Sequence, residues 1–309
     1  MSNRQAQVFK ATTRLTHRAN KSMMANMSTR FEGSLKSFDR SEIFFQLWAV
    51  EKPKGTMIIT HGQAEHSECY HPLARNLQNE GWESYGFDLR GHGRSQGKRG
   101  YVAKFSDYVS DLKATVEMVV RERKDKSAPL ILFGHSMGGL IVTLLATDWK
   151  NPPFQALALS SPLYGLSVAV PAIKDYAAKV LVNWLPSITL HNELKYSDLT
   201  RDEAMLKSYE HDVLRHDKIS PAVYLGMLES FPQVFERANK LDMPVLMQLA
   251  GVDKVVSTPA AQDVFALLPN KKNVMQLYPE SMHEIYNDLD RDQAFADFRK
   301  FINQFQVNA

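Results

Sequence analysis

The sequence contains a single cysteine, Cys69, in 309 residues, so no disulfide can form within the chain. It also lacks an uninterrupted apolar run of the roughly 18 residues that a membrane-spanning helix needs. The first thirty residues lack the apolar core of roughly 7 to 15 residues that is typical of a secretory signal. We therefore expect a cytoplasmic protein, and the sequence leaves peripheral contact with a membrane open.

Strong charge of one sign and metal-binding spacings are missing as well. The formal net charge is only +3, and no basic run is interleaved with aromatic residues, so we expect no nucleic-acid partner. His66, Glu68 and His71 do not have the H-E-x-x-H spacing, and the glycines of residues 91–98 fit neither common nucleotide-binding pattern. We accordingly expect no metal and no cofactor; the sequence leaves the oligomeric state open.

Residues 1–30 carry basic side chains and no acid. This composition resembles a transit peptide or a basic membrane-surface helix. The apolar residues are sparse and show no helical stripe, which favours a disordered tail or a start codon assigned too far upstream, since Met23, Met24 and Met27 follow. We predict a basic, disordered tail for residues 1–30.

The most informative motif is Gly134–Gly138, which reads G-H-S-M-G and matches the G-x-S-x-G nucleophile elbow. An apolar stretch at 129–133 precedes it and predicts a buried strand, and residues 140–149 predict a helix. In such an elbow a strained turn exposes the serine hydroxyl, and the glycines leave room for neighbouring backbone. Ser136 is therefore the candidate nucleophile.

Strand and helix patterns alternate along most of the chain, which predicts an α/β protein with a mostly parallel central sheet and helices on both faces. The alternation stops after a strand that ends at Ser160, the sixth expected, and resumes with a strand near residue 244. We therefore assign residues 31–162 and 233–309 to the core and residues 163–232 to a mainly helical cap, or lid.

A serine nucleophile needs a histidine base and a carboxylate that orients it, in the chain order serine, acid, histidine. Asp253 and His283 each follow a predicted strand after Ser136, and no other histidine occurs beyond position 216. Asp242 and Asp263 are the weaker alternatives for the acid. The backbone N–H groups of Met137 and Gln63 are the expected oxyanion donors.

Several stretches together are more specific than the elbow alone: 61–67 (HGQAEHS), 88–95 (DLRGHGRS), 134–139 (GHSMGG), 161–162 (SP) and 252–253 (VD). With these the chain, from about residue 31 to 305, resembles the monoacylglycerol lipase and lysophospholipase branch of the α/β-hydrolases. The resemblance implies the α/β-hydrolase fold, a Ser136–Asp253–His283 triad, and a mobile amphipathic lid that touches membrane and lines an acyl tunnel.

The resemblance also implies head-group contacts at Glu65, Cys69 and Tyr286. Monoacylglycerol lipases place arginine at the position of Cys69 and histidine at that of Tyr286. The sequence therefore does not identify the head group of the lipid substrate. Independently, residues 168–184 contain an apolar helical face flanked by lysines, which suits either a lipid surface or packing on the core.

The predicted function is a serine carboxylester hydrolase that releases a fatty acid from single-chain acyl lipids. The same triad also suits a short-chain carboxylesterase or an acyltransferase. A non-catalytic, ligand-binding member of the fold is the alternative from a different class.

Overall fold

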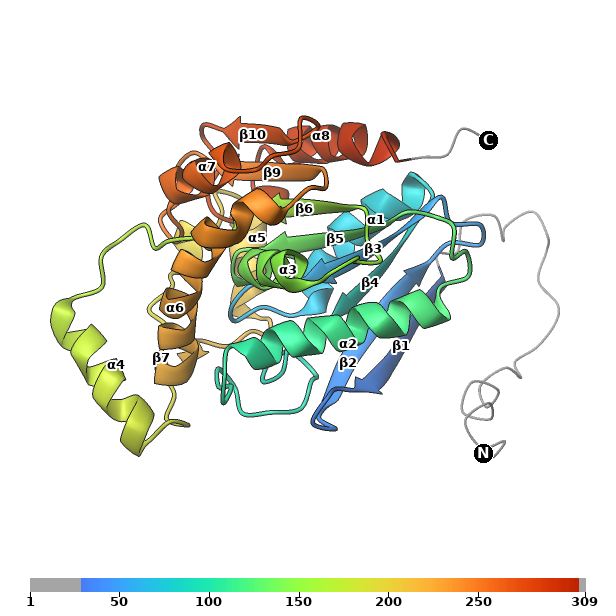
Figure 1. Cartoon of the computed structure of the whole chain (residues 1–309). Helices are drawn as coiled ribbons and strands as arrows, with labels where there is room; N and C mark the ends of the chain where they lie inside the picture. The colour runs from blue at the N-terminus through green and yellow to red at the C-terminus, as the bar shows by residue number, and fades with distance from the viewer. Residues whose placement is uncertain (1–28, 306–309) are drawn as a thin grey trace, which may run out of the picture.

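The computed structural model describes residues 29–305, in which an eight-stranded sheet carries helices on both faces (Figure 1). Residues 1–28 of the predicted basic tail lie outside the described range. The strands of the sheet are β1 (Thr29–Lys36), β2 (Glu42–Ala49), β3 (Gly55–Thr60), β4 (Trp82–Phe87), β5 (Leu130–His135), β6 (Ala156–Ser160), β9 (Val245–Ala250) and β10 (Val274–Tyr278).

The sheet has the strand order β1-β2-β4-β3-β5-β6-β9-β10. β1 and β2 form an antiparallel hairpin, and β2 also runs antiparallel to β4. All pairings from β4 to β10 are parallel. The mostly parallel sheet expected from the sequence is confirmed, and the carboxyl ends of six strands meet at one edge.

Two hydrophobic cores form because side chains alternate across each strand. Ile58 of β3 belongs to the core that contains α2, α3, α6 and α7, whereas its neighbours Met57 and Ile59 belong to the core that contains α1 and α8. Every residue of β3 is buried, as expected for a parallel strand covered on both faces. These helices are α1 (His71–Asn79), α2 (Ser106–Glu122), α3 (Met137–Asp148), α6 (Pro221–Arg237), α7 (Thr258–Ala266) and α8 (Arg291–Asn303).

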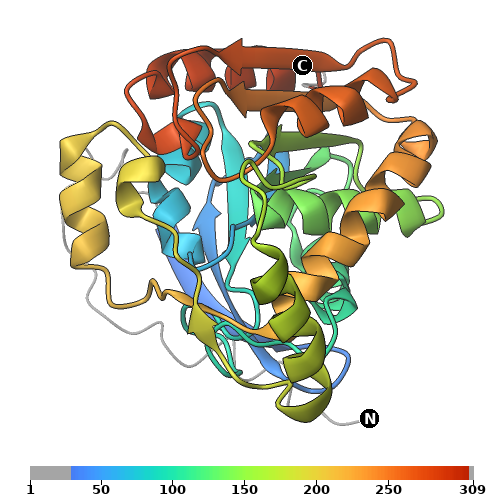
Figure 2. The same ribbon diagram turned by 90° about the vertical axis from the view of Figure 1, so that its left-hand side faces the viewer.

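Residues 161–244 connect β6 to β9, and we call them the insertion. Figure 1 shows the insertion on the side to which the arrowheads of the parallel strands point, and Figure 2 looks onto that side. Besides α6 it contains α4 (Ala172–Trp184), β7 (Leu190–His191), η4 (Tyr196–Asp198), α5 (Glu203–Glu210), β8 (Lys218–Ile219) and η5 (Ala238–Lys240). The insertion therefore lies beside the carboxyl edge of the sheet.

The structure differs from the sequence-based boundaries at α6. The predicted cap ends at Pro232, which lies inside α6, and the helix continues to Arg237. Proline usually ends a helix because it lacks an N–H and crowds the preceding turn. Here Met227, Ser230 and Val234 are buried, and α6 packs against α3, so tertiary packing holds the helix through the proline.

The later part of the insertion is fixed to the chain that follows β10. The Thr200 hydroxyl donates to the Asn287 carbonyl at 2.8 Å. Arg201 pairs with Asp288 at 3.1 Å, and Arg291 pairs with Asp202 at 2.5 Å. In contrast, α4 packs against α6 and buries only Ala178. The insertion thus has an anchored part around 199–202 and a loosely packed α4.

Within residues 29–305, no helix combines the length and the apolar character needed to cross a bilayer.

Candidate active site

Ser136 stands at the turn between β5 and α3 with φ 53° and ψ −122°. A positive φ is unfavourable for a residue with a side chain, so the surrounding backbone has to hold it. It does so with a hydrogen bond from the Ser136 N–H to the Ser160 carbonyl at 3.0 Å. The predicted strand, turn and helix around Ser136 are all present.

The glycines on either side of Ser136 allow this close packing. A Cβ at Gly138 would lie 2.2 Å from the Thr60 carbonyl oxygen, and one at Gly134 would lie 2.6 Å from the Gly138 oxygen. Both distances are far too short for non-bonded atoms. The G-x-S-x-G pattern is therefore a steric requirement of this turn.

His283 and Asp253 come from the loops after β10 and β9. His283 Nδ1 lies 2.8 Å from Asp253 Oδ2. A carboxylate only accepts, so Nδ1 carries the proton and Nε2 is left with a lone pair. The other oxygen of Asp253, Oδ1, accepts the N–H groups of Val255 and Val256 at 2.8 and 2.9 Å. Asp253 is thereby held rigidly against the imidazole.

Burial and charge act in opposite directions on this pair. Burial alone would raise the pKa of Asp253, but the His283 charge and hydrogen bond outweigh it and hold that pKa below its usual value. Burial lowers the pKa of His283, while Asp253 raises it more strongly, so the net pKa of His283 lies above its ordinary value. The negative charge of Asp253 stabilises the protonated imidazole.

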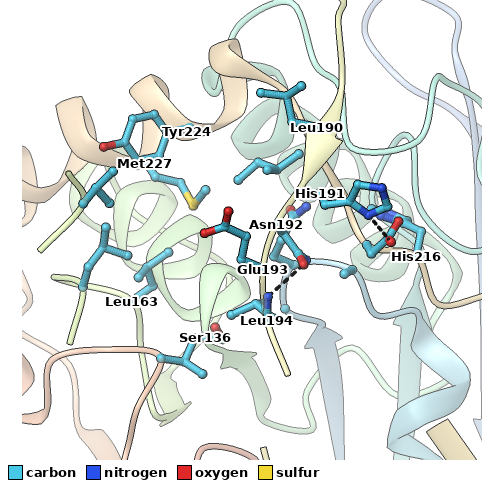
Figure 3. A pocket seen from close by; sticks show the side chains of 18 of the residues that line it. Ser136, Leu163, Leu190, His191, Asn192, Glu193, Leu194, His216, Tyr224 and Met227 are labelled. Carbon is cyan, nitrogen blue, oxygen red and sulfur yellow. Dashed lines mark hydrogen bonds and ion pairs between the residues drawn. The ribbon is translucent and has the colours of Figure 1, made fainter. Parts of the chain in front are cut away.

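Ser136 and His283 both line a cavity of about 820 Å³. Figure 3 shows Ser136 at the bottom of the view, with Leu163, Met227 and Tyr224 on one side and the chain from Leu190 on the other. Most of these lining residues belong to the insertion, and the volume is in the range of small-molecule sites. Ser136 thus lies at a cavity whose wall is mainly apolar.

The loop after β3, residues 61–65, borders the same cavity through Gly62, Gln63, Ala64 and Glu65. We call it the oxyanion loop because the sequence predicts an oxyanion donor at Gln63. Burial lowers the pKa of His61 to about 4, so its ring is neutral. The ring accepts the Leu89 N–H at Nε2 and contacts the Gly62 carbonyl at Nδ1. His61 thus braces the loop.

The two predicted oxyanion donors occupy different environments. Gln63 lines the cavity, and its side-chain amide donates to the Lys218 carbonyl of β8 at 2.9 Å. Met137 is the first residue of α3, and its side chain is buried. The side chain of Gln63 therefore ties the oxyanion loop to the insertion.

The three predicted head-group residues are not brought together on the large cavity. Only Glu65 of the three lines it. Glu65, Cys69 and Tyr286 instead meet at a second cavity of only about 10 Å³, which is too small for a lipid head group. The Tyr286 hydroxyl donates to the Gln248 side chain in the core. A head-group contact for Cys69 and Tyr286 remains a prediction from the resemblance alone.

Sequence reasoning missed Arg215, which lies between α5 and β8 and lines the large cavity. Its side chain is only 4% exposed and lies between the carboxylates of Glu65 and Glu284. No motif marks this arginine, because both partners are distant in sequence and it stands in an ordinary polar stretch.

Within residues 29–305, the side chains of His66, Cys69 and Asp212 form a cluster of possible metal ligands. One potential ligand atom from each lies within 4.8 Å of the others. His66 Nε2 already contacts Asp212 Oδ2 at 2.8 Å. Burial raises the pKa of the Cys69 thiol, and a protonated thiol is a poor metal ligand. The geometry therefore describes a histidine–aspartate pair better than a metal site.

Comparison with known proteins places the chain among hydrolases. The model of the serine aminopeptidase S33 family matches residues 51–290. The chain is 29% identical to a monoacylglycerol lipase of Mycolicibacterium smegmatis over 280 residues, which cover 89% of this chain and 98% of the relative. It is 27% identical to phospholipase YtpA of Bacillus subtilis, covering 84% and 98%. The crystal structure of Paleococcus ferrophilus monoacylglycerol lipase superposes with a TM-score of 0.78 at 26% identity, covering 85% of this chain and 99% of that one.

Proposed function

The chain belongs to the serine aminopeptidase S33 family of hydrolases, and we propose that it is a serine hydrolase that releases a fatty acid from single-chain acyl lipids. Its relatives include proteins named monoacylglycerol lipase and phospholipase, which favours a lipid ester as substrate. The reaction is thus of the monoacylglycerol lipase or lysophospholipase type.

One observation carries this proposal: Ser136 and His283 border a cavity of about 820 Å³ whose far wall is mainly apolar. A single long acyl chain fits such a space, and each buried methylene contributes roughly 0.8 kcal/mol to binding. Leu163, Leu181 and Met227 are among the side chains that would contact the acyl chain.

In the proposed reaction, Ser136 Oγ attacks the ester carbonyl while His283 Nε2 takes the hydroxyl proton. The C–O bond to the alcohol then breaks, and His283 returns the proton to the leaving alcohol. Water, activated by the same imidazole, attacks the acyl-enzyme and releases the fatty acid. Asp253 keeps the imidazole in the required tautomer, which its 2.8 Å contact with Nδ1 supports.

The negative oxygen that forms during attack needs hydrogen-bond donors. We assign this role to the backbone N–H groups of Gln63 and Met137. The position of Met137 at the first turn of α3 supports the assignment, because the N–H groups at a helix start are unpaired within the helix and lie at its positive end.

The activity should fall on the acid side of the pH range. A protonated His283 cannot accept the serine proton, and Asp253 raises the pKa of this imidazole. We therefore expect kcat/KM to be constant at alkaline pH and to fall about tenfold per pH unit below the pKa of His283. The midpoint should lie above that of an unperturbed histidine. An acid limb centred below the unperturbed value, with the protein still folded by circular dichroism, would contradict the role of Asp253.

A hydrolysis panel tests the substrate class. Monoacylglycerols, lysophospholipids and short p-nitrophenyl esters should be compared at equal concentration, each below its aggregation threshold. We expect long single-chain substrates to give the highest kcat/KM because they fill the apolar cavity. Highest activity on acetate or butyrate esters would instead indicate a short-chain carboxylesterase. Transfer of the acyl group to an added alcohol in preference to water would indicate an acyltransferase. Absence of both turnover and fluorophosphonate labelling would indicate a non-catalytic binding protein.

We further propose that the insertion acts as a cap over Ser136 and contacts membrane through α4. Lys174, Ala177, Ala178 and Leu181 of α4 line the cavity. The side chains of Ile173, Tyr176 and Trp184 are exposed by 78%, 69% and 81%. An exposed apolar surface beside the cavity is suited to the boundary between lipid head groups and acyl chains.

Replacing Trp184 by aspartate should separate membrane contact from chemistry. We expect hydrolysis of a lipid presented in vesicles to fall about 10- to 100-fold, since burying one large apolar side chain contributes about 1.5–3 kcal/mol. Hydrolysis of a water-soluble p-nitrophenyl ester should stay unchanged.

Val213→Asp is the matched control, because Val213 is 91% exposed in the insertion but lies outside α4. An equal loss in both variants would mean that added negative charge, and not the α4 surface, weakens lipid hydrolysis.

A further inference from the structure

Arg215 joins the insertion to both loops that carry the proposed catalytic groups. One contact leads to Glu65 on the oxyanion loop, and the other leads to Glu284, the residue after His283. Resting on the proposed function, we propose that Arg215 is a positioning residue. It acts through Glu65 to hold the oxyanion loop in its working conformation and through Glu284 to hold the histidine loop beside it.

Glu65 is the link to the oxyanion loop. Its Oε2 accepts the Gly62 N–H at 2.7 Å and the Tyr70 hydroxyl at 2.7 Å. Its Oε1 lies 3.5 Å from Arg215 Nη2. The residue between Gly62 and Glu65 with the least favourable backbone is Ala64, at φ 67°. Glu65 thus holds the strained part of the loop, which includes Gln63, through its hydrogen bond from the Gly62 N–H. Arg215 supplies the positive charge opposite this carboxylate.

Glu284 is the link to the histidine loop. Arg215 Nη1 lies 3.2 Å from its Oε1, while the Tyr209 hydroxyl and the Asn287 amide donate to Oε2 at 2.5 and 2.8 Å. The Glu284 N–H donates to the Leu199 carbonyl at 2.8 Å. This residue is therefore held from both the insertion and the core, directly beside the proposed base.

The chain after Arg215 continues along the oxyanion loop. The His216 N–H donates to the Ala64 carbonyl at 3.3 Å, and the Lys218 carbonyl accepts the Gln63 side chain at 2.9 Å. Three successive residues of the loop, 63 to 65, are thereby contacted by residues 215–218. The insertion is a structural part of the oxyanion loop as well as a wall of the cavity.

One cation faces two buried carboxylates at this junction. The groups that interact with these two carboxylates are Tyr70, Cys69, Tyr209, Asn287, His283 and His135. Burial and the Glu284 charge raise the pKa of Glu65 to about 7, while Arg215 opposes the rise. The ionised form of Glu65 suits its two donors, the Gly62 N–H and the Tyr70 hydroxyl. Loss of Arg215 should therefore raise this pKa further and increase the protonated fraction of Glu65 at neutral pH.

Arg215→Met tests the proposal, because it removes the charge and keeps much of the volume. We expect kcat at pH 7 to fall about 10- to 100-fold, the scale of a small displacement of groups that stabilise the transition state, with little change in KM. The loss should diminish as the pH is raised to about 9 and Glu65 ionises. Arg215→Lys keeps the charge and should retain more activity than Arg215→Met at pH 7.

A second substitution checks that the effect passes through Glu65. In Glu65→Gln/Arg215→Met, the amide oxygen replaces the carboxylate as acceptor and stays neutral at every pH. We expect kcat at pH 7 to exceed that of Arg215→Met. The additional fall in kcat toward acid pH, which in Arg215→Met comes from protonation of Glu65, should disappear. The pKa of the His283 imidazole, measured by NMR in both variants, shows whether a change in the pH profile comes from His283 or from Glu65.

Arg291→Met is the matched control, since Arg291 also joins the core to the insertion, through Asp202, but touches neither glutamate. It should keep the wild-type pH profile. Unchanged kcat and pH profile in Arg215→Met would overturn the inference, as would a rise in KM at constant kcat, which would make Arg215 a substrate contact. Failure of the proposed function is distinct, because the wild-type protein itself would then be inactive and unlabelled.

Discussion

Replacing Ser136 by alanine is expected to lower the turnover of any ester that the protein hydrolyses by about 10⁴-fold or more. The substitution removes the only atom that can form the acyl-enzyme, and the oxyanion donors and the cavity are left intact. Turnover of the preferred ester from the panel, followed by fatty-acid release, measures the loss. Labelling by a fluorophosphonate probe should disappear in parallel, because the probe bonds to the same oxygen.

Ser110→Ala provides the matched control for Ser136→Ala. Ser110 is an outward-facing serine of α2 whose hydroxyl donates to the Ser106 carbonyl at 3.1 Å. Both variants should keep the wild-type melting temperature within a few degrees. Labelling that persists in Ser136→Ala would place the nucleophile at another residue and contradict the proposed reaction.

Replacing Asp253 by asparagine is expected to lower kcat by about 10³- to 10⁴-fold. The amide can donate its N–H to His283 Nδ1, which would move the imidazole proton to Nε2 and remove the lone pair that accepts the serine proton. The loss should appear in kcat with KM nearly constant, since Asp253 does not line the cavity.

Asp242→Asn and Asp263→Asn test the two other acids that the sequence allows at this step. Both side chains are exposed, whereas that of Asp253 is completely buried against His283. Each should therefore retain wild-type kcat. A loss in either variant that equals the loss in Asp253→Asn would show that the acid has been assigned to the wrong residue.

The fold and the elbow could be predicted because their signals are local. A buried parallel strand requires a continuous apolar run, and the turn at Ser136 requires glycine where a Cβ would meet backbone oxygens. The resemblance to monoacylglycerol lipases and lysophospholipases, which rests on several such stretches, is confirmed by the relatives and solved structures. Chain order then points to His283 as the candidate base and to Asp253 as the candidate acid, with Asp242 and Asp263 as weaker alternatives.

The surroundings of the site could not be predicted, because they depend on contacts between residues far apart in sequence. Arg215 and Glu65 are 150 positions apart, and neither side chain belongs to a periodic pattern. The short strands β7 and β8 span two residues each, too few for a sequence signal. The path of α6 through Pro232 depends on its packing against α3. Local propensity decides none of these features.

The uneven anchoring of the insertion bears on how new substrate ranges arise. The part around Thr200 and Arg215 shares hydrogen bonds and ion pairs with the chain that bears the proposed base, so we expect few of its residues to change without disturbing the proposed chemistry. By contrast, α4 buries a single alanine and contributes mainly apolar surface. We therefore expect that residues 168–189, which precede the pairing of β7 with β8, can be exchanged as a unit, in nature or in the laboratory, to reshape the cavity beside Ser136 while residues 190–220 are retained.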